Sequence, residues 1–232
     1  MMKSPFIGRG IALMMIVTLI AWTTIRALGA RPPATPKFPF PKPAVDLPLT
    51  TTKGNESAIL AGGCFWGVQA VFEQLKGVAS VTSGYSGGFV DSPAYHTVSL
   101  GITGHAESVR IQYDPSQISY GQLLMVFFSV AHDPTQKNRQ GPDTGSQYRS
   151  AIFYANNDQK RVAEAYIAQL NAAKVYSRPI ATQVVPFKAF FAAEDYHQDY
   201  LKQNPDNPYI VINDLPKLEN LKKFFPALCR IN

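Results

Sequence analysis

From residue 57 onward, strand-like and helix-like segments alternate, and this order limits the fold more than any other feature of the chain. Patterns typical of strands lie at 57–61, 78–85, 106–113, 150–154 and 180–186. Patterns typical of helices lie at 64–75, 119–131, 157–173 and 193–203. Such alternation is typical of α/β proteins, in which helices pack on a sheet. We predict a two-layer α/β sandwich with helices packed on a mixed sheet of about four to six strands.

Two connections in this pattern are long for a compact domain. The first, 86–105, is rich in glycine, and the second, 132–147, is rich in Gly, Pro, Asp, Gln and Arg. Long loops are uncommon in compact domains unless they have a functional role. Because both loops lead directly into strands, we expect them to carry parts of a functional site.

The first 30 residues do not fit this pattern. An apolar run, GIALMMIVTLIAW at 10–22, follows Lys3 and Arg9. The run is shorter than the roughly 20 residues of a spanning helix, which favours a cleaved signal peptide over an uncleaved anchor. We therefore assign 1–30 to a signal peptide or membrane anchor. The protein is expected to be exported, either periplasmic or anchored and facing the periplasm.

Proline separates this segment from the rest of the chain. Seven of the residues in 31–48 are proline, a composition that opposes helix and sheet and favours an extended spacer. We assign 31–50 to a proline-rich linker and 51–232 to one catalytic domain.

The net charge of +6 is concentrated at the start of the chain. Residues 1–50 contain six basic residues and one acidic residue, so the remainder carries about +1. A nearly neutral domain without a basic stripe argues against a nucleic-acid partner.

Cys64 stands where the first predicted helix begins, directly after Gly62 and Gly63. Free N–H groups and the helix dipole favour the thiolate at such a position, and the thiolate is the reactive form. Phe65 and Trp66 are placed to form an apolar hollow beside the sulfur. The alternative, that Cys64 is a small buried hydrophobic residue among core aromatics, stays open on residue type alone.

Polar residues in the two long loops and the third strand complete a candidate site. Glu107 is either a solvated surface charge or, if it faces an apolar hollow, a general acid with a raised pKa. Tyr95 and Tyr148 can donate hydrogen bonds to a polar oxygen. Asp143 either belongs to that network or bonds only the backbone of its own turn.

Other chemistry lacks the residues it would need. The four histidines are widely spaced and only two cysteines are present, so we expect no metal site. The sequence has no phosphate-binding glycine loop, nucleotide fingerprint or G-x-S-x-G motif. We therefore expect no bound cofactor.

Several motifs in order resemble those of the A-type peptide methionine sulfoxide reductases, from about residue 57 to residue 213. The matching segments are GCFWG (63–67), GYSGG (84–88), PAYHTV (93–98), TGHAESV (103–109), YDP (113–115), HDPT (132–135), NRQGPDTGSQYRSAIFY (138–154) and EDYHQDYL (194–201). The resemblance implies reduction of the S epimer of methionine sulfoxide, in proteins and as the free amino acid.

The resemblance also implies roles for individual residues. Cys64 is the nucleophile and Glu107 the proton donor. The residues that surround the bound sulfoxide are Phe65 and Trp66 at the methyl group, with Tyr95, Asp143 and Tyr148 at the oxygen. The product on Cys64 is a sulfenic acid, recycled by an external thiol, either a thioredoxin-like protein or a small thiol. The expected partners are oxidised proteins and that reductant, with the membrane a further contact through 1–30, and the protein is expected to be a monomer.

Two positions depart from the family pattern. Position 69 is Gln where many relatives carry Glu, with no evident effect. Many relatives also carry recycling cysteines after the EDYHQDY segment, whereas this chain has only Cys229 near its end. On a flexible tail Cys229 is a candidate resolving thiol. The alternatives are an idle thiol and a structural disulfide, which suits an oxidising compartment but would block Cys64.

Two rival functions are weighed against this enzyme. A catalytically inactive methionine-binding module is disfavoured because every proposed chemical residue is present. A general thiol-disulfide oxidoreductase is disfavoured because the chain has no C-x-x-C motif.

Overall fold

A computed structural model of the chain describes residues 34–230. The signal or anchor segment at 1–30 lies outside the described residues. Within the described part of the chain, no helix is long and apolar enough to cross a membrane.

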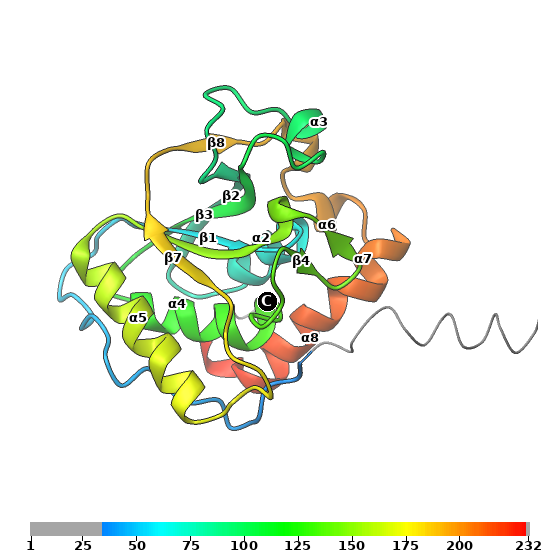
Figure 1. Cartoon of the computed structure of the whole chain (residues 1–232). Coiled ribbons are helices and arrows are strands. Elements are labelled where there is room, and N and C mark those ends of the chain that lie inside the picture. The colour runs from blue at the N-terminus through cyan, green and yellow to red at the C-terminus, as the bar shows by residue number, and fades with distance from the viewer. Residues whose placement is uncertain (1–33, 231–232) are drawn as a thin grey trace, which may run out of the picture. The chain divides into compact units, whose positions relative to one another are not determined.

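A six-stranded sheet organises the described residues (Figure 1). Its strands in chain order are β1 (Glu56–Gly62), β2 (Val78–Ser86), β3 (Ala106–Tyr113), β6 (Ser150–Tyr154), β7 (Gln183–Pro186) and β8 (Phe190–Ala192). The spatial order is β7-β6-β1-β3-β2-β8, and every pair is antiparallel except β6 with β7. The prediction of a mixed sheet is therefore confirmed, although β8 was not predicted.

The sheet is strongly curled. Strands β7 and β8 form its opposite edges, yet only three residues separate Pro186 from Phe190. Five interstrand spacings in a flat sheet would span about 24 Å, whereas this connection reaches at most about 14 Å. Curling brings the two edges together, and the connection closes over one face of the sheet.

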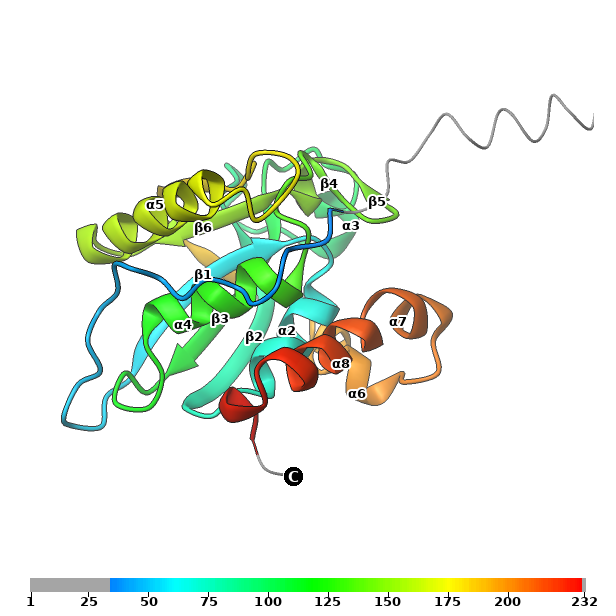
Figure 2. The same ribbon diagram turned by 90° about the horizontal axis from the view of Figure 1, so that it is seen from below.

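Helices cover the other face (Figure 2). The longer ones are α2 (Phe65–Glu73), α4 (Tyr120–Val126) with a π-helical continuation (Phe127–Ala131), α5 (Asn157–Ala172) and α8 (Leu215–Phe224). The main core forms between these helices and alternate residues of the strands, such as Ala58, Leu60, Val109 and Ile111. The remaining elements are short: α3 (Tyr95–Val98), α6 (Tyr200–Gln203), α7 (Pro208–Asn213), the hairpin β4 (Arg139–Gln140) with β5 (Asp143–Thr144), and 3-10 turns at Ser146–Tyr148, Asp195–His197 and Pro226–Leu228.

Local sequence signals explain some boundaries and miss others. At the start of α4 the Ser119 hydroxyl accepts from the Gln122 backbone N–H, and the Gln122 side chain accepts from the Ser119 N–H, as the capping box predicts.

The helix predicted over 193–203 is wrong. Asp199 has a positive φ of 53° that interrupts it, and the Gln198 side chain turns back to bond the backbone of Ser83 in β2.

The proline-rich segment packs against the domain. Its described part, 34–50, contains neither helix nor strand. Phe38 stacks on Phe224 of α8 with ring centroids 3.6 Å apart, and Phe40 is buried. Asp46 accepts hydrogen bonds from the hydroxyl of Ser119, the N-cap of α4, and from the backbone N–H of Gly121. A free spacer would not make such contacts. Here apolar side chains between the prolines pack against the core. The domain boundary at residue 51 stays a prediction.

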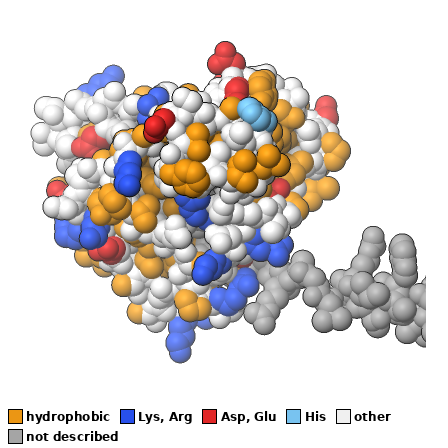
Figure 3. Space-filling model, turned by 45° about the horizontal axis from the view of Figure 1, so that its top comes forward, with side chains coloured by type: hydrophobic (Ala, Val, Ile, Leu, Met, Phe, Trp, Pro, Cys, Tyr) orange, Lys and Arg blue, Asp and Glu red, His pale blue; other side chains and the backbone are white. Residues whose placement is uncertain are grey.

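Large exposed hydrophobic side chains are concentrated in a few segments. Among residues 34–230 they are, apart from Leu49, Phe89, Leu100, Ile102, Tyr196, Val211 and Ile212. These six lie in the loop around α3, in the turn at Asp195–His197 and on α7. Figure 3 looks towards the α3 end and shows hydrophobic side chains gathered there.

Candidate active site

The site begins at the turn between β1 and α2. Gly63 has a φ of +88°, and a Cβ on it would lie 2.4 Å from Cβ of Gln140. Only glycine therefore allows both the left-handed turn and this close packing. The turn delivers Cys64 to the cap position immediately before α2, where it is 7% exposed.

Glu107 reaches the same point from β3. One of its carboxyl oxygens, Oε2, accepts the backbone N–H of Phe65 at 3.1 Å, and the side chain is 2% exposed. Burial raises the pKa of Glu107 to about 8; the Phe65 N–H opposes that rise and the charge of Asp143 adds to it. Glu107 is thus predominantly a neutral acid below about pH 8, the state expected of a proton donor.

One pocket of about 190 Å³ brings the predicted residues together. It is lined by Cys64, Phe65, Trp66, Tyr95, Glu107, Asp143 and Tyr148, which are all the predicted nucleophile, acid and substrate-contact residues, and by Tyr209. They come from α2, α3, β3, the hairpin strand β5, the turn at Ser146–Tyr148 and α7. Both long loops therefore contribute to the site.

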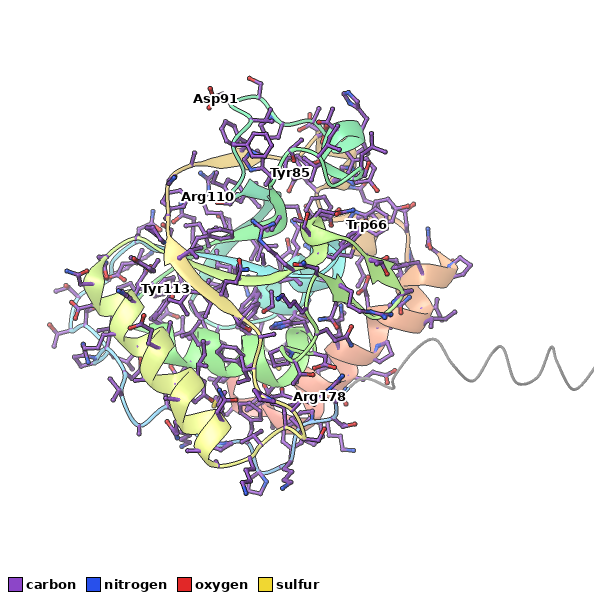
Figure 4. The ribbon with its side chains drawn as sticks, viewed as in Figure 1. Trp66, Tyr85, Asp91, Arg110, Tyr113 and Arg178 are labelled. Carbon is purple, nitrogen blue, oxygen red and sulfur yellow. The ribbon has the colours of Figure 1, made fainter. Side chains whose placement is uncertain are left out.

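Trp66 is held by the segment that follows β8. Its indole Nε1–H donates to Nδ1 of His197 at 3.1 Å, and its ring stacks on Tyr200 with centroids 3.7 Å apart. Figure 4 labels Trp66 on the α6 side of the domain. Burial lowers the pKa of His197, which keeps the imidazole neutral and able to accept from Trp66.

Glu194, in the same segment, orients two tyrosines. One carboxyl oxygen accepts the backbone N–H of Tyr95 at 2.8 Å and the other accepts the hydroxyl of Tyr85 at 2.8 Å. Sequence reasoning matched the EDYHQDYL motif to the family without giving Glu194 or His197 a role. Their structural role depends on contacts with residues about 100 positions earlier, which local spacing does not reveal.

The pocket hydroxyls are kept in the donor form. Burial raises the pKa of Tyr95 to about 12 and raises that of Tyr148 as well. Asp143 accepts a hydrogen bond from the hydroxyl of Tyr209 on α7. Its side chain therefore bonds a residue outside its own turn. Tyr209 was missed because it follows the last predicted helix, 193–203, in a segment without a recognised motif.

The predicted low pKa of Cys64 is wrong for this structure. Burial raises the pKa of the thiol well above its ordinary value, and negative charge on Glu107, once it ionises above about pH 8, and on Asp214 raises it further. The Trp66 N–H at the helix start and the Lys217 ammonium lower it by less. The N–H effect on which the prediction rested is present, but desolvation is larger.

Gln69, the departure from the family pattern, is hydrogen-bonded inside the core through both the nitrogen and the oxygen of its amide. Its Nε2 donates to the Val81 carbonyl at 3.0 Å, and its Oε1 accepts the Ser83 hydroxyl at 2.9 Å and the Asp199 N–H at 3.1 Å. An amide supplies both the donor and the acceptor that this position uses, whereas an ionised Glu has no donor.

The remaining histidines of the core have structural partners. His132 bonds the Phe127 carbonyl at 3.0 Å through Nδ1 and the Ser150 hydroxyl at 2.7 Å through Nε2. Within residues 34–230, no group of three His, Cys, Asp or Glu side chains is arranged to hold a metal ion.

Cys229 lies at the opposite end of α2 from Cys64. It forms a backbone bridge with Leu75, eleven positions after Cys64, which corresponds to roughly 16 Å along a helix. The flexible tail that sequence reasoning assumed is instead α7, α8 and a final turn. Arg230 fixes its end by donating to backbone carbonyls of Gln74 and Leu75. Both cysteines are free thiols.

Comparison with known proteins gives a consistent result. The family model described as peptide methionine sulfoxide reductase matches residues 56–227. The chain belongs to this family. The peptide methionine sulfoxide reductase MsrA 2 of Mesorhizobium japonicum is 61% identical, covering 75% of this chain and 90% of the relative. MsrA 2 of Synechocystis is 55% identical, covering 79% and 87%.

Solved structures of methionine sulfoxide reductases share the fold. Reduced Mxr1 of Saccharomyces cerevisiae aligns with a TM-score of 0.60 at 33% identity, covering 68% of this chain and 94% of that one. Methionine sulfoxide reductase A of Corynebacterium diphtheriae aligns with a TM-score of 0.58 at 35% identity, covering 77% and 91%. The chain is therefore a methionine sulfoxide reductase of the A type, an oxidoreductase, as its motifs predicted.

Proposed function

We propose that the enzyme reduces the S epimer of methionine sulfoxide by attack of the Cys64 thiolate, with Glu107 as the proton donor. The observation that carries the proposal is the convergence of a buried thiol and a neutral buried carboxyl on one small pocket. The choice of the S epimer follows from membership of the family.

The chemistry balances with these two groups. The thiolate sulfur attacks the sulfoxide sulfur while the Glu107 proton moves to the sulfoxide oxygen, because an unprotonated oxide is a poor leaving group. The oxygen then passes to Cys64. The products are methionine, a sulfenic acid on Cys64 and the Glu107 carboxylate, which regains a proton from water.

The other pocket residues fit the remaining parts of a sulfoxide. The Phe65 and Trp66 rings offer an apolar surface for the methyl group. The hydroxyls of Tyr95 and Tyr148 stay protonated and can donate to the oxygen as its negative charge grows. Asp143 holds Tyr209 and contributes charge that keeps Glu107 protonated.

Recycling of the sulfenic acid is proposed to use an external thiol, either a thioredoxin-like protein or a small thiol. Two thiol groups are needed: the first forms a mixed disulfide with Cys64 and releases water, and the second releases the Cys64 thiol. Cys229 is badly placed to be the first, because it lies beyond the far end of α2 and its backbone is bonded on both sides.

The substrate is proposed to be a polypeptide whose neighbouring residues rest on the exposed apolar side chains around the pocket. The pocket accommodates one side chain, so the residues next to the sulfoxide must lie on its border. Leu100 and Ile102 flank Gly101, where an added Cβ would lie 3.0 Å from Oε1 of Gln147, the residue before Tyr148. Tyr196 adjoins His197, whose ring lies 4.2 Å from that of Tyr95. Apolar residues next to the oxidised methionine would therefore improve binding.

Peptide pairs test this surface. A peptide with leucine on both sides of the sulfoxide should have a several-fold higher kcat/KM than one with serine. The double variant Leu100→Ser, Ile102→Ser should remove that preference while leaving the serine-flanked peptide unaffected. Leu49→Ser is the matched control, because Leu49 is also exposed but adjoins no pocket residue. A preference unchanged in the double variant would contradict this surface.

Repair of exported proteins, by a monomer in the periplasm or anchored to face it, is also part of the proposal. It is supported by the apolar run at 10–22 with its flanking basic residues. Cell fractionation, mass measurement of the mature N-terminus and sedimentation of the purified protein test location, cleavage and oligomeric state. Recovery of uncleaved protein only from the cytosol would contradict export.

The decisive experiment for the mechanism is a single turnover without added thiol. After one equivalent of sulfoxide peptide, the intact mass should show one added oxygen atom in both wild type and Cys229→Ser, and none in Cys64→Ser. Loss of two hydrogen atoms in the wild type alone would show that Cys229 resolves Cys64. Turnover by Cys64→Ser would refute the nucleophile.

A further inference from the structure

The C-terminal segment places a buried ion pair against the first turn of α2. Lys217 Nζ lies 2.9 Å from Oδ1 of Asp214. The Asp214 side chain is fully buried and that of Lys217 is 16% exposed. Buried pairs are costly to desolvate and add little net stability. Net stability alone therefore does not account for this pair.

Gly67 makes room for this pair. A Cβ on Gly67 would lie 2.0 Å from Asp214 Oδ1 and 2.8 Å from Lys217 Nζ. Gly67 is three residues after Cys64, so it lies in the same helical turn. The last glycine of the GCFWG motif thus brings both charges to the helix end that presents the nucleophile.

The charges around Cys64 are unbalanced without Lys217. Six titratable or charged groups interact electrostatically with the Cys64 sulfur: Glu107, Asp214, Lys217, Tyr95, Tyr148 and Tyr209. Within this set Lys217 is the cation. Its ammonium also acts on Asp143 and on His132. Burial and two carboxyl groups oppose a thiolate here, whereas the Trp66 N–H and the Lys217 ammonium favour it.

We propose that Lys217, seated on Gly67 and held by Asp214, is a positioning residue that supplies the positive charge needed for Cys64 to react as a thiolate. Asp214 fixes the ammonium, but its own charge acts on the sulfur in the opposite direction and more strongly than that of Lys217. This inference deepens the proposed function, because it rests on Cys64 as the nucleophile. It gives the C-terminal segment a role in activating Cys64.

The test is the pH dependence of Cys64 alkylation by iodoacetamide in a Cys229→Ser background, where Cys64 is the only thiol. Lys217→Met should raise the apparent pKa of Cys64 by about one unit, which slows alkylation about tenfold below that pKa and leaves the high-pH plateau unchanged. Asp214→Asn should lower the apparent pKa. The double variant Asp214→Asn, Lys217→Met should return it towards the wild-type value.

Lys222→Met is the matched control, because Lys222 lies on the same helix but is exposed. It should leave the profile unchanged. An unshifted profile in folded Lys217→Met, or an equal loss of rate at every pH, would overturn the proposal. If Lys217→Met does not fold, Asp214→Asn decides: a lower pKa supports the proposal and an equal or higher one overturns it. Alkylation needs no turnover, so failure here is distinct from failure of the proposed reaction.

Discussion

One cysteine lies near each end of α2, and the two thiols differ in burial and in the side chains around them. At the first end Cys64 is buried beside a neutral carboxyl, aromatic rings and a buried ion pair. At the other end Cys229 is only partly buried, and its Sγ contacts the Phe225 carbonyl at 3.4 Å. The surroundings of the pocket, and not the presence of a thiol alone, therefore confer the proposed chemistry on Cys64.

The largest effect should come from exchanging serine for each cysteine. Cys64→Ser should lower turnover of a sulfoxide peptide, with dithiothreitol as reductant, by at least about a thousandfold, the scale seen when an enzyme loses its nucleophile. Cys229→Ser should retain wild-type turnover. Comparable losses in the two variants would abolish the distinction between the two ends.

Loss of the carboxyl should be nearly as severe. Glu107→Gln keeps an acceptor for the Phe65 N–H but cannot give up a proton, so kcat/KM should fall by about 10²–10⁴-fold. In the wild type kcat/KM should decline as the pH rises through about 8, where Glu107 ionises. Steady-state rates between pH 6 and pH 10 check this, and a decline of the same shape in Glu107→Gln would assign it to another group.

The same carboxyl should make the stability of the fold depend on pH. The folded-state pKa of about 8 lies above the ordinary value of 4.5, so the folded protein binds the proton more tightly than the unfolded chain does. Stability should therefore fall as the pH rises from about 4.5 to about 8 and then level off. In urea unfolding, Glu107→Gln should gain stability relative to wild type at pH 9 and show little difference near pH 4.5. An equal difference at both pH values would contradict the raised pKa.

A smaller effect is expected midway along α2. Gln69→Glu replaces the donor to the Val81 carbonyl with a buried carboxyl, and an unsatisfied buried group costs about 1–3 kcal/mol. The free energy of unfolding should fall by that amount at pH 8 and by less at pH 5, where a buried carboxyl is protonated and can donate. Gln159→Glu provides a comparison, since Gln159 is also buried and bonded through its amide. An unchanged stability would mean that the chain adjusts to the carboxyl.

The smallest effect on stability is expected at Cys229, beyond the far end of α2. Cys229→Ser exchanges a partly buried sulfur for oxygen while keeping the backbone bridge to Leu75, so unfolding free energy should change by less than about 0.5 kcal/mol. Thermal unfolding of the purified variant measures it. A larger loss would give Cys229 a structural importance that its contacts do not indicate.

Sequence patterns predicted most elements whose signals are local. Strands 106–113 and 150–154 agree with β3 and β6 to the residue, because alternation and turn residues are read over short stretches. The edge strand β8 and the broken helix after it were missed. Their form depends on curling of the sheet and on Gln198 bonding β2, which are contacts between distant segments.

The residues of the site divide in the same way, into those with a local sequence signal and those placed by contacts between distant segments. Motif matching named seven of the eight residues that line the pocket. Motif matching did not identify Tyr209, Asp214 and Lys217, because their segment carries no recognised motif and was expected to be a flexible tail. The ionisation of Cys64 was also misjudged, since the helix start is visible in the sequence but the degree of burial is not.

Removing the proline-rich segment at 34–50 would expose part of the core and leave several polar groups without their partners. A fragment that starts at the apparent edge of the catalytic region would discard Phe40 from the core and deprive Tyr166 of its acceptor, the Pro41 carbonyl. Ser119 and Gly121 would also lose their bonds to Asp46. Soluble versions should therefore begin no later than residue 34, where the Ala34 N–H already bonds Asp133.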